Sequence, residues 1–346
     1  MSDARGPEIG DTSIVIVPSN VLAAYDATDE RVVPLAGGLI NETFLVGESG
    51  APKFVLQKLH KVFEPTVNID IDVVTKRLKA AGLQTPLLVR TTTGARSFGR
   101  WRALTFVPGL SCDFVSGPEQ AESAAALIGR FHAALDGWDY TFAFVRHGVH
   151  DTKAHLGKLR AHLESSEPPV AGATELAARI LGLADGLPAL PTFGLRICHG
   201  DLKISNLRFA SDDPNRATCL LDLDTIGLQS LAYELGDAMR SWCNRSAEDA
   251  APNFDRSIFA AALRGYRRTM PSSVTPEELA TTVVGTVTVC VELAARFCSD
   301  VFDDSYFGWD ATRYPSRRAH NLARAASMAD LATQVHEAQN DLAAML

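Results

Sequence analysis

The spacing of hydrophobic residues changes near residue 107 of the chain. Before that point most apolar residues alternate with polar ones or form short continuous runs, which are the patterns typical of strands. We predict a short helix at residues 20–25, an amphipathic helix at residues 66–81, and strands at residues 32–35, 39–46, 53–59, 87–90 and 100–106.

Beyond residue 107 the apolar residues recur every three or four positions, as on the buried side of helices. We predict helices at residues 116–135, 153–163, 174–187, 233–243, 254–270, 276–297 and from 315 to the C-terminus. The change predicts an α+β protein with two lobes and a hinge near residues 106–110. The predicted divisions are a disordered tail (1–12), a small β-rich N-lobe (13–107) and a larger, mostly helical C-lobe (108–346).

Composition narrows the classes of partner. With 46% hydrophobic residues, the 346-residue chain can bury a sizeable core. A net charge of −8 leaves no basic excess to neutralise nucleic-acid phosphates or to bind an anionic membrane. The most apolar segment, residues 283–295, carries Glu292 and is shorter than the roughly 20 residues that a membrane span needs. We therefore expect no nucleic-acid and no membrane partner.

The cysteines indicate a reducing compartment. The six are scattered, none forms a Cys-x-x-Cys pair, and most have apolar neighbours. This pattern favours reduced core residues over disulfides or zinc ligands. The polar start of the chain has no basic-then-apolar signal pattern. We expect a cytoplasmic protein.

The segment from His199 to Asn206 reads His-Gly-Asp-Leu-Lys-Ile-Ser-Asn and matches the catalytic-loop pattern of kinases, with Gly200 where protein kinases have arginine. In such a loop Asp201 accepts the proton of the acceptor hydroxyl, and Asn206 offers its amide oxygen to magnesium. Lys203 is placed to offset the charge of the transferred phosphoryl group. The alternative is a solvated turn, because Asp, Ser and Asn also favour turns.

A second apolar segment, Leu220-Leu221-Asp222-Leu223-Asp224, places Asp222 sixteen positions after Asn206. A carboxylate at the end of an apolar strand is costly to bury unless it is paired or bound to a metal. On a regular strand Asp222 and Asp224 face the same side. We predict Asp222 as a metal ligand and Asp224 as an ancillary ligand, with a capping role for Asp224 as the alternative. Together the two segments predict an ATP- and magnesium-dependent phosphotransferase.

Candidates for the nucleotide site lie in the predicted N-lobe. Gly37 and Gly38 form the turn between two β-rich runs, either as an ordinary hairpin or as a loop whose amides cover phosphates. The strand at residues 53–59 is the one that carries the phosphate-gripping lysine in kinases. Gln57 and Lys58 are the candidates, and they point to opposite faces. Phe106, at the predicted hinge, is assigned to the same site.

These motifs resemble the aminoglycoside phosphotransferase and choline kinase family of kinase-like enzymes. Within that family, further segments are similar to N-acetylhexosamine 1-kinases. They are Gly-Gly-Leu-Ile-Asn41-Glu-Thr43-Phe, Phe-Val-Leu-Gln57-Lys58-Leu, Leu-Asp222-Leu-Asp224-Thr, Ala-Tyr-Glu-Leu-Gly-Asp237-Ala-Met-Arg240, Glu292-Leu-Ala-Ala-Arg296-Phe, Tyr306-Phe and Asn321-Leu-Ala-Arg324.

The resemblance implies a bilobal, protein-kinase-like fold with ATP between the lobes. It implies transfer of the γ-phosphoryl group to a sugar hydroxyl, the anomeric one in N-acetylhexosamine 1-kinases. It also places Gly38, Asn41 and Thr43 in the nucleotide loop and Gln57 at the phosphate-gripping position. Four residues fall in segments that line the substrate side: Asp237, Arg240, Arg296 and Tyr306.

Several interpretations stay open at this level. Arg240 and Arg296 also suit structural salt bridges, and Tyr306 also suits packing. Leu39 stands where the hexosamine kinases usually have a histidine, and the segment between Arg296 and Tyr306 is slightly shorter. Both differences leave the acceptor open between a sugar and another small alcohol such as choline, homoserine or an aminoglycoside. A nucleotide-binding pseudokinase is the non-enzymatic alternative. The expected partners are ATP and a small-molecule substrate, with the protein a monomer or a dimer.

Overall fold

A computed structural model describes residues 17–35, 41–48, 50–165 and 171–346. The chain divides into two compact units. The N-terminal unit comprises Met1–Asn68 and Leu87–Phe106, and the C-terminal unit comprises Ile69–Pro86 and Val107–Leu346.

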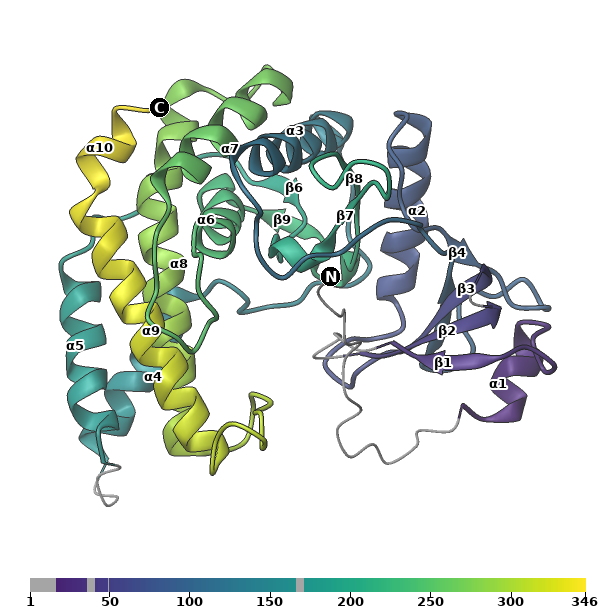
Figure 1. Ribbon diagram of the computed structural model, residues 1–346, viewed down its shortest axis with the longest axis horizontal. Coiled ribbons are helices and arrows are strands. Elements are labelled where there is room, and N and C mark those ends of the chain that lie inside the picture. Colours follow the sequence, from purple (N-terminus) through teal and green to yellow (C-terminus); the bar gives the residue numbers. More distant parts are fainter. Residues whose placement is uncertain (1–16, 36–40, 49, 166–170) are drawn as a thin grey trace, which may run out of the picture. The chain divides into compact units, whose positions relative to one another are not determined.

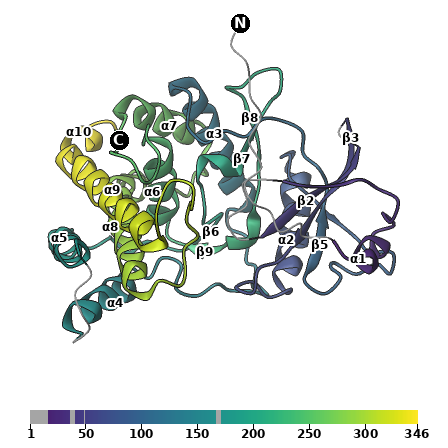
Figure 2. The same ribbon diagram turned by 60° about the horizontal axis from the view of Figure 1, so that its bottom comes forward.

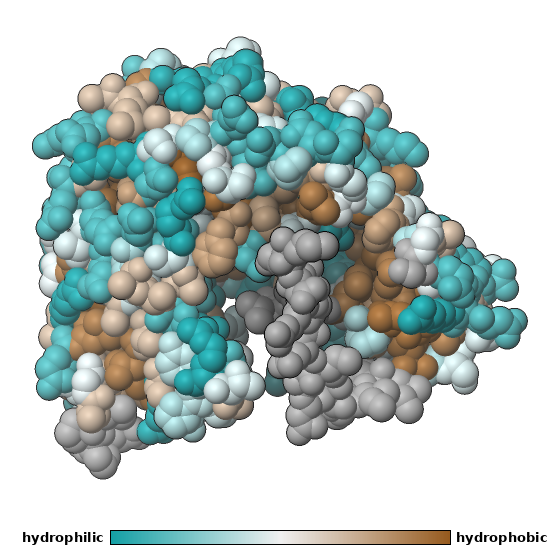
Figure 3. All heavy atoms as spheres, viewed as in Figure 1, coloured by the Kyte–Doolittle hydropathy of each residue, from teal (hydrophilic) through white to brown (hydrophobic). Residues whose placement is uncertain are grey.

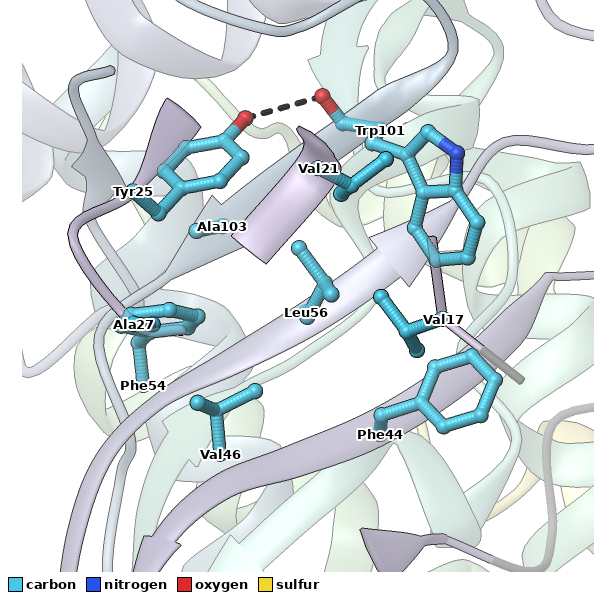
Figure 4. Close-up of a cluster of buried hydrophobic side chains, with 10 residues drawn as sticks. All are labelled: Val17, Val21, Tyr25, Ala27, Phe44, Val46, Phe54, Leu56, Trp101 and Ala103. Atoms are coloured by element: carbon cyan, nitrogen blue, oxygen red, sulfur yellow. Dashed lines mark hydrogen bonds between the residues drawn. The ribbon is translucent and has the colours of Figure 1, made fainter. Parts of the chain in front are cut away.

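The N-terminal unit is built on an antiparallel sheet with the strand order β1-β2-β3-β5-β4. Its elements are α1 (Ser19–Ala24), β1 (Val32–Pro34), β2 (Glu42–Glu48), β3 (Ala51–Lys58), β4 (Leu88–Val89) and β5 (Trp101–Leu104). Alternate residues of the central strands, such as Phe44, Leu56 and Ala103, point to one face and pack with α1 into a buried cluster (Figure 4). The hydroxyl of Tyr25 donates a hydrogen bond of 2.9 Å to the carbonyl oxygen of Trp101 at its edge.

The C-terminal unit is mainly helical. Its helices are α2 (Val67–Ala80), α3 (Pro118–Leu135), α4 (Thr152–Glu164), α5 (Ala173–Asp185), α6 (Leu231–Trp242), α7 (Arg256–Thr269), α8 (Pro276–Asp303), α9 (Arg317–Glu337) and α10 (Gln339–Ala343). Helix α2 begins two residues before Ile69, the first residue of this unit. Helix α3 packs on α7, and α8 packs on both α6 and α9 (Figures 1 and 2). Two small antiparallel sheets pair β6 (Arg196–Cys198) with β9 (Gly227–Gln229) and β7 (Leu207–Phe209) with β8 (Ala217–Leu220).

Asp70 explains why α2 groups with the helical unit. Its carboxylate accepts hydrogen bonds from the hydroxyl of Tyr140 (2.8 Å) and from the backbone N–H groups of Ala143 (2.8 Å) and Phe144 (2.9 Å). The predicted N-lobe of residues 13–107 included residues 69–86, which the contacts assign to the C-terminal unit.

Helix α8 is the central helix of the C-terminal unit and continues six residues beyond its predicted end at residue 297. Thr275 caps it by accepting a hydrogen bond from the N–H of Glu278. Among the described residues it is the one helix long and apolar enough to cross a membrane, but 83% of its apolar window is buried inside the fold, as in a core helix. Polar residues cover most of the visible face of the surrounding helices (Figure 3).

Candidate active site

The loop from His199 to Asn206, which we call the catalytic loop, follows β6 and ends in a short 3₁₀ turn (Ile204–Asn206). Gly200 has φ +81°, and a Cβ atom there would lie 2.4 Å from the side-chain nitrogen of Gln229 and 2.6 Å from the carbonyl oxygen of Thr225. No larger residue fits this position, which accounts for glycine where protein kinases have arginine.

Three side chains predicted from the sequence meet in this loop. One carboxylate oxygen of Asp201 accepts hydrogen bonds from the ammonium of Lys203 and from the amide nitrogen of Asn206, both at 3.0 Å. The same amide nitrogen also binds the carbonyl oxygen of Asp201 at 2.9 Å. Burial alone would raise the pKa of Asp201, but the charge and hydrogen bond of Lys203 outweigh it and hold the pKa below its usual value. Asp201 is therefore a carboxylate at neutral pH.

Asp222 follows directly on a residue bonded to the catalytic loop. The N–H of Leu221 donates to the carbonyl oxygen of Asn206 (2.8 Å), and Nε2 of His199 lies 2.7 Å from the carbonyl oxygen of Leu221. Because Nδ1 of His199 accepts from the N–H of Asp201 (3.3 Å), its proton sits on Nε2 and is donated to Leu221. His199 thus ties the catalytic loop to the residue before Asp222.

The prediction of a regular strand through Asp222 and Asp224 is wrong. Strand β8 ends at Leu220, Asp222 has a left-handed backbone (φ 59°, ψ 61°), and Leu223–Thr225 is a 3₁₀ turn. Asp222 is exposed, whereas Asp224 is only 2% exposed, so the two carboxylates have different surroundings. A left-handed aspartate is a strained conformation of the kind that gathers at functional sites.

Helix α6 holds the catalytic loop with one face. The buried carboxylate of Glu234 accepts hydrogen bonds from the N–H groups of His199 (2.8 Å) and Gly200 (2.9 Å). One turn later Asp237 accepts from the N–H of Leu202 (3.1 Å), and the indole of Trp242 donates to the carbonyl oxygen of Leu202 (2.8 Å). The spacing of three residues places the side chains of Glu234 and Asp237 on one side of the helix.

Sequence reasoning missed the role of Glu234. Its signal was present, because it is an acid within the apolar run of α6, and a buried acid needs partners. Nε2 of His132 lies 3.2 Å from the carboxylate of Glu234, and the hydroxyl of Tyr266 lies 2.9 Å from Nδ1 of His132. Burial raises the pKa of Glu234, but its hydrogen bond to His132 and the neighbouring charges lower it further than burial raises it.

Two residues predicted on the substrate side are bonded to each other. Nε and Nη2 of Arg240 donate to one oxygen of Asp237 at 3.0 and 2.8 Å. The chain of contacts continues from Arg240 to Glu248 (3.8 Å), from Glu248 to Arg324 (3.4 Å), and from Arg324 to the carbonyl oxygen of Gly308 (2.8 Å). A continuous polar network thus joins the catalytic loop to residues 304–309, which we call the aromatic loop.

Asp300, near the end of α8, shapes the aromatic loop. Its carboxylate accepts hydrogen bonds from three successive N–H groups, those of Ser305 (3.0 Å), Tyr306 (2.8 Å) and Phe307 (2.9 Å). The amide of Asn321 donates to the same carboxylate at 2.8 Å. The side chain of Tyr306 is left 58% exposed.

Two guanidinium groups lie beside the aromatic side chains of this loop. Nη2 of Arg146 donates to the hydroxyl of Tyr306 at 3.2 Å. The guanidinium of Arg296 lies 5.7 Å from the ring centre of Phe307. The aromatic loop therefore brings together Tyr306 and Arg296, both predicted from the sequence, with Arg146, which was not.

The remaining candidates belong to the N-terminal unit. Asn41 is buried, and its amide oxygen accepts from the N–H of His60 at 2.9 Å. The amide nitrogen of Gln57 lies 3.3 Å from the hydroxyl of Thr43, while Lys58 points the other way and pairs with Glu42 at 2.8 Å.

Phe106 is half-buried at the end of this unit. Gly37 and Gly38 lie outside the described residues. The roles assigned to these residues in nucleotide binding stay predictions.

Solved structures similar to this chain include small-molecule kinases. A microcompartment-associated aminopropanol kinase superposes with a TM-score of 0.67 at 17% identity, over 93% of this chain and 97% of that one. Choline kinase from Cryptosporidium parvum Iowa II gives 0.61 at 13% identity, over 93% and 95%. An amicoumacin kinase in complex with AMP-PNP, Ca²⁺ and Ami gives 0.61 at 13% identity, over 92% of each chain. At these identities the likeness shows the fold.

The predicted α+β, protein-kinase-like fold is thereby confirmed, with its small antiparallel sheet and its mainly helical second part. Residues 31–271, well over half of the chain, match the phosphotransferase enzyme family. The predicted enzyme class is confirmed with it. The chain belongs to the phosphotransferase enzyme family that includes the aminoglycoside phosphotransferases.

Proposed function

We propose that the protein transfers the γ-phosphoryl group of ATP to a hydroxyl of a sugar or amino sugar, as N-acetylhexosamine 1-kinases do. The observation that carries the proposal is the arrangement of Asp201, whose carboxylate is held by Lys203 and Asn206 at 3.0 Å each. An ionised carboxylate fixed by two donors is suited to orient an acceptor hydroxyl and take its proton.

The residues in and around the catalytic loop have different roles in this proposal. Asp201 would bind the acceptor hydroxyl and receive its proton as the hydroxyl oxygen attacks the γ-phosphorus, while the bond to the bridging oxygen breaks and ADP leaves. Lys203 keeps its charge, because the raising effect of Asp201 and Asp222 on its pKa outweighs the lowering effect of burial. Its ammonium offsets negative charge on the transferred group. Glu234 and His199 keep the loop in place and take no part in the bond changes.

The donor set fits magnesium. The amide nitrogen of Asn206 is used twice by Asp201, so its oxygen is the atom left to bind a cation. Asp222 adds an exposed carboxylate one residue beyond Leu221, which is bonded to Asn206. Carboxylate and amide oxygens are the ligands that Mg²⁺ accepts beside phosphate oxygens and water. Bound there, Mg²⁺ would neutralise phosphate charge, with Asp224 as an ancillary ligand in this proposal.

The use of ATP is supported by the named relatives. One similar structure contains AMP-PNP, an ATP analogue, and another, an aminoglycoside phosphotransferase, contains ADP. In this chain we assign the nucleotide to Gly37, Gly38, Asn41, Thr43, Gln57 and Phe106.

The choice of acceptor rests on the aromatic loop. An exposed tyrosine beside Arg146, and a phenylalanine beside Arg296, suit a neutral polyol, because aromatic faces pack on apolar sugar faces and guanidinium groups donate to hydroxyls or carbonyls. The same two arginines oppose a cation such as choline. A kinase for another small alcohol is the second candidate, because similar structures include choline and aminopropanol kinases.

An acceptor panel tests the proposal. ADP formation is measured with N-acetylhexosamines, free hexoses, choline, homoserine and an aminoglycoside, with Asp201→Asn as the inactive control. We expect turnover with a sugar that the control lacks. Turnover with choline alone would show that the protein is a kinase for another small alcohol and not for a sugar. No turnover with any acceptor would favour a nucleotide-binding pseudokinase.

A further inference from the structure

A polar row crosses the three central strands of the N-terminal sheet. In the strand register Thr43 of β2 stands opposite Gln57 of β3, and Gln57 stands opposite Arg102 of β5. The neighbouring row, Phe44, Leu56 and Ala103, belongs to the hydrophobic cluster on the other face (Figure 4). The alternation of side chains therefore puts a cation and an amide on the face away from that cluster.

The guanidinium of Arg102 fixes the direction of the amide of Gln57. Arg102 is only 1% exposed, and its Nε and Nη2 both donate to Oε1 of Gln57, at 2.9 and 2.7 Å. The oxygen of the amide is thereby engaged with Arg102. Its nitrogen points the other way, 3.3 Å from the hydroxyl of Thr43. A neutral amide is thus held between two side chains and is polarised by a buried positive charge. Its nitrogen carries two N–H groups, of which the hydroxyl of Thr43 accepts one.

This arrangement stands where kinases have a charged side chain. In the kinase pattern a lysine on the third strand grips the α- and β-phosphates. Here that strand offers the neutral Gln57 on one face. Lys58 is on the opposite face, where it pairs with Glu42 at 2.8 Å and lies 5.7 Å from the ring centre of Trp101. The positive charge on the face of Gln57 belongs instead to Arg102, one strand away.

We propose that Arg102 is a positioning residue for the nucleotide: it orients and polarises the amide of Gln57, which donates to the phosphates in place of a lysine. The inference rests on the proposed use of ATP. In other kinases one lysine binds the phosphates. Here we assign that role to two side chains, the buried cation of Arg102 and the amide donor of Gln57.

A charge swap tests the proposal. Arg102→Gln removes the charge, and the double variant Gln57→Lys/Arg102→Gln returns it on the third strand. Binding of ATP is measured by calorimetry without acceptor, beside melting temperatures and the separate values of KM for ATP and kcat. We expect Arg102→Gln to weaken ATP binding about 10- to 100-fold, as for loss of a charged hydrogen-bond partner, and to raise the KM for ATP more than it lowers kcat. The double variant is expected to recover most of the affinity.

Arg100→Met is the matched control. The guanidinium of Arg100 binds the carbonyl oxygens of Leu59 (3.0 Å) and Phe63 (2.8 Å), so the variant loses a structural arginine of the same unit outside the polar row. We expect a lower melting temperature with unchanged ATP affinity.

Two results would overturn this inference and leave the proposed function standing. One is wild-type ATP affinity in Arg102→Gln, and the other is a stable double variant that binds ATP no better than Arg102→Gln. A wild-type protein that binds no ATP would instead overturn the proposed function and this inference together.

Discussion

The catalytic loop and the aromatic loop are supported in the same way but present different surfaces. In each, a buried carboxylate on a helix accepts several backbone N–H groups: Glu234 accepts two, and Asp300 accepts three. In the catalytic loop the reactive side chain, Asp201, is itself held by two donors. In the aromatic loop the side chain of Tyr306 is mostly exposed.

The difference separates two tasks. A proton acceptor must be held within a few tenths of an ångström of its partner, so its side chain is fixed as well as its backbone. A surface that selects a substrate needs a fixed backbone and side chains free to meet the substrate. We infer that the catalytic loop determines the transfer and the aromatic loop determines the acceptor.

The largest expected effect comes from Asp201→Asn. The amide cannot take a proton, so kcat should fall by about 10²–10⁴-fold, the usual contribution of a general base. ATP affinity and melting temperature should stay near wild type, because the substitution is nearly isosteric. Steady-state kinetics and calorimetry measure both. A variant with wild-type kcat would remove Asp201 from the mechanism.

A smaller loss of kcat is expected from Glu234→Gln, which alters the support of the catalytic loop and the contact with His132 but leaves Asp201 in place. One of the two N–H groups, of His199 or Gly200, loses its acceptor, at a cost of about 1–3 kcal/mol. We expect a lower melting temperature and a lower kcat, with the KM for the acceptor little changed.

The control for this variant is Glu292→Gln, another buried carboxylate, which accepts from Thr152 at 2.6 Å and makes its bonds outside the catalytic loop. If both variants lowered kcat equally, the specific role of Glu234 in the loop would be refuted.

Asp300→Asn should weaken binding of the acceptor and leave ATP binding unchanged. The variant weakens the bonds to Ser305, Tyr306 and Phe307, and the aromatic loop loses its fixed backbone. We expect the KM for the acceptor to rise about tenfold, the effect of roughly 1.4 kcal/mol of lost binding, with unchanged ATP affinity. Asp255→Asn, which alters the cap of α7 by the same substitution, is the control. An unchanged KM would show that the aromatic loop does not meet the acceptor.

The smallest expected effect in the catalytic loop is a shift in the pH dependence of kcat/KM. Burial raises the pKa of Asp201, but the charge and hydrogen bond of Lys203 lower it by more. Protonation of Asp201 should therefore not reduce wild-type kcat/KM until the pH falls below the usual range of aspartate. In Lys203→Met the effect of burial remains without the compensating charge, so the pKa rises and the acid limb moves to higher pH. A pH–rate profile measures the shift. An unmoved limb would contradict the coupling.

The meeting of the three side chains of the catalytic loop could be predicted from the sequence because their spacing is local. Asp201, Lys203 and Asn206 lie within six residues, and a short loop has few ways to arrange them. The same reasoning failed at Asp222, where a left-handed residue ended the strand earlier than its apolar pattern indicated.

Partners distant in the sequence were the least predictable. Glu234 meets His199 across 35 positions, and Arg102 meets Gln57 across 45. Their pairing depends on which helix and which strand become neighbours, and no local pattern carries that information. Arg146 beside Tyr306, 160 positions away, was missed for the same reason.

One measurement tests the separation of the two loops most directly: kcat and the KM for the accepted sugar, determined side by side for wild type, Asp201→Asn and Asp300→Asn. We predict that Asp201→Asn lowers kcat at an almost unchanged KM, and that Asp300→Asn raises the KM at an almost unchanged kcat. Changes of the same constant by similar factors in both variants would contradict the separation.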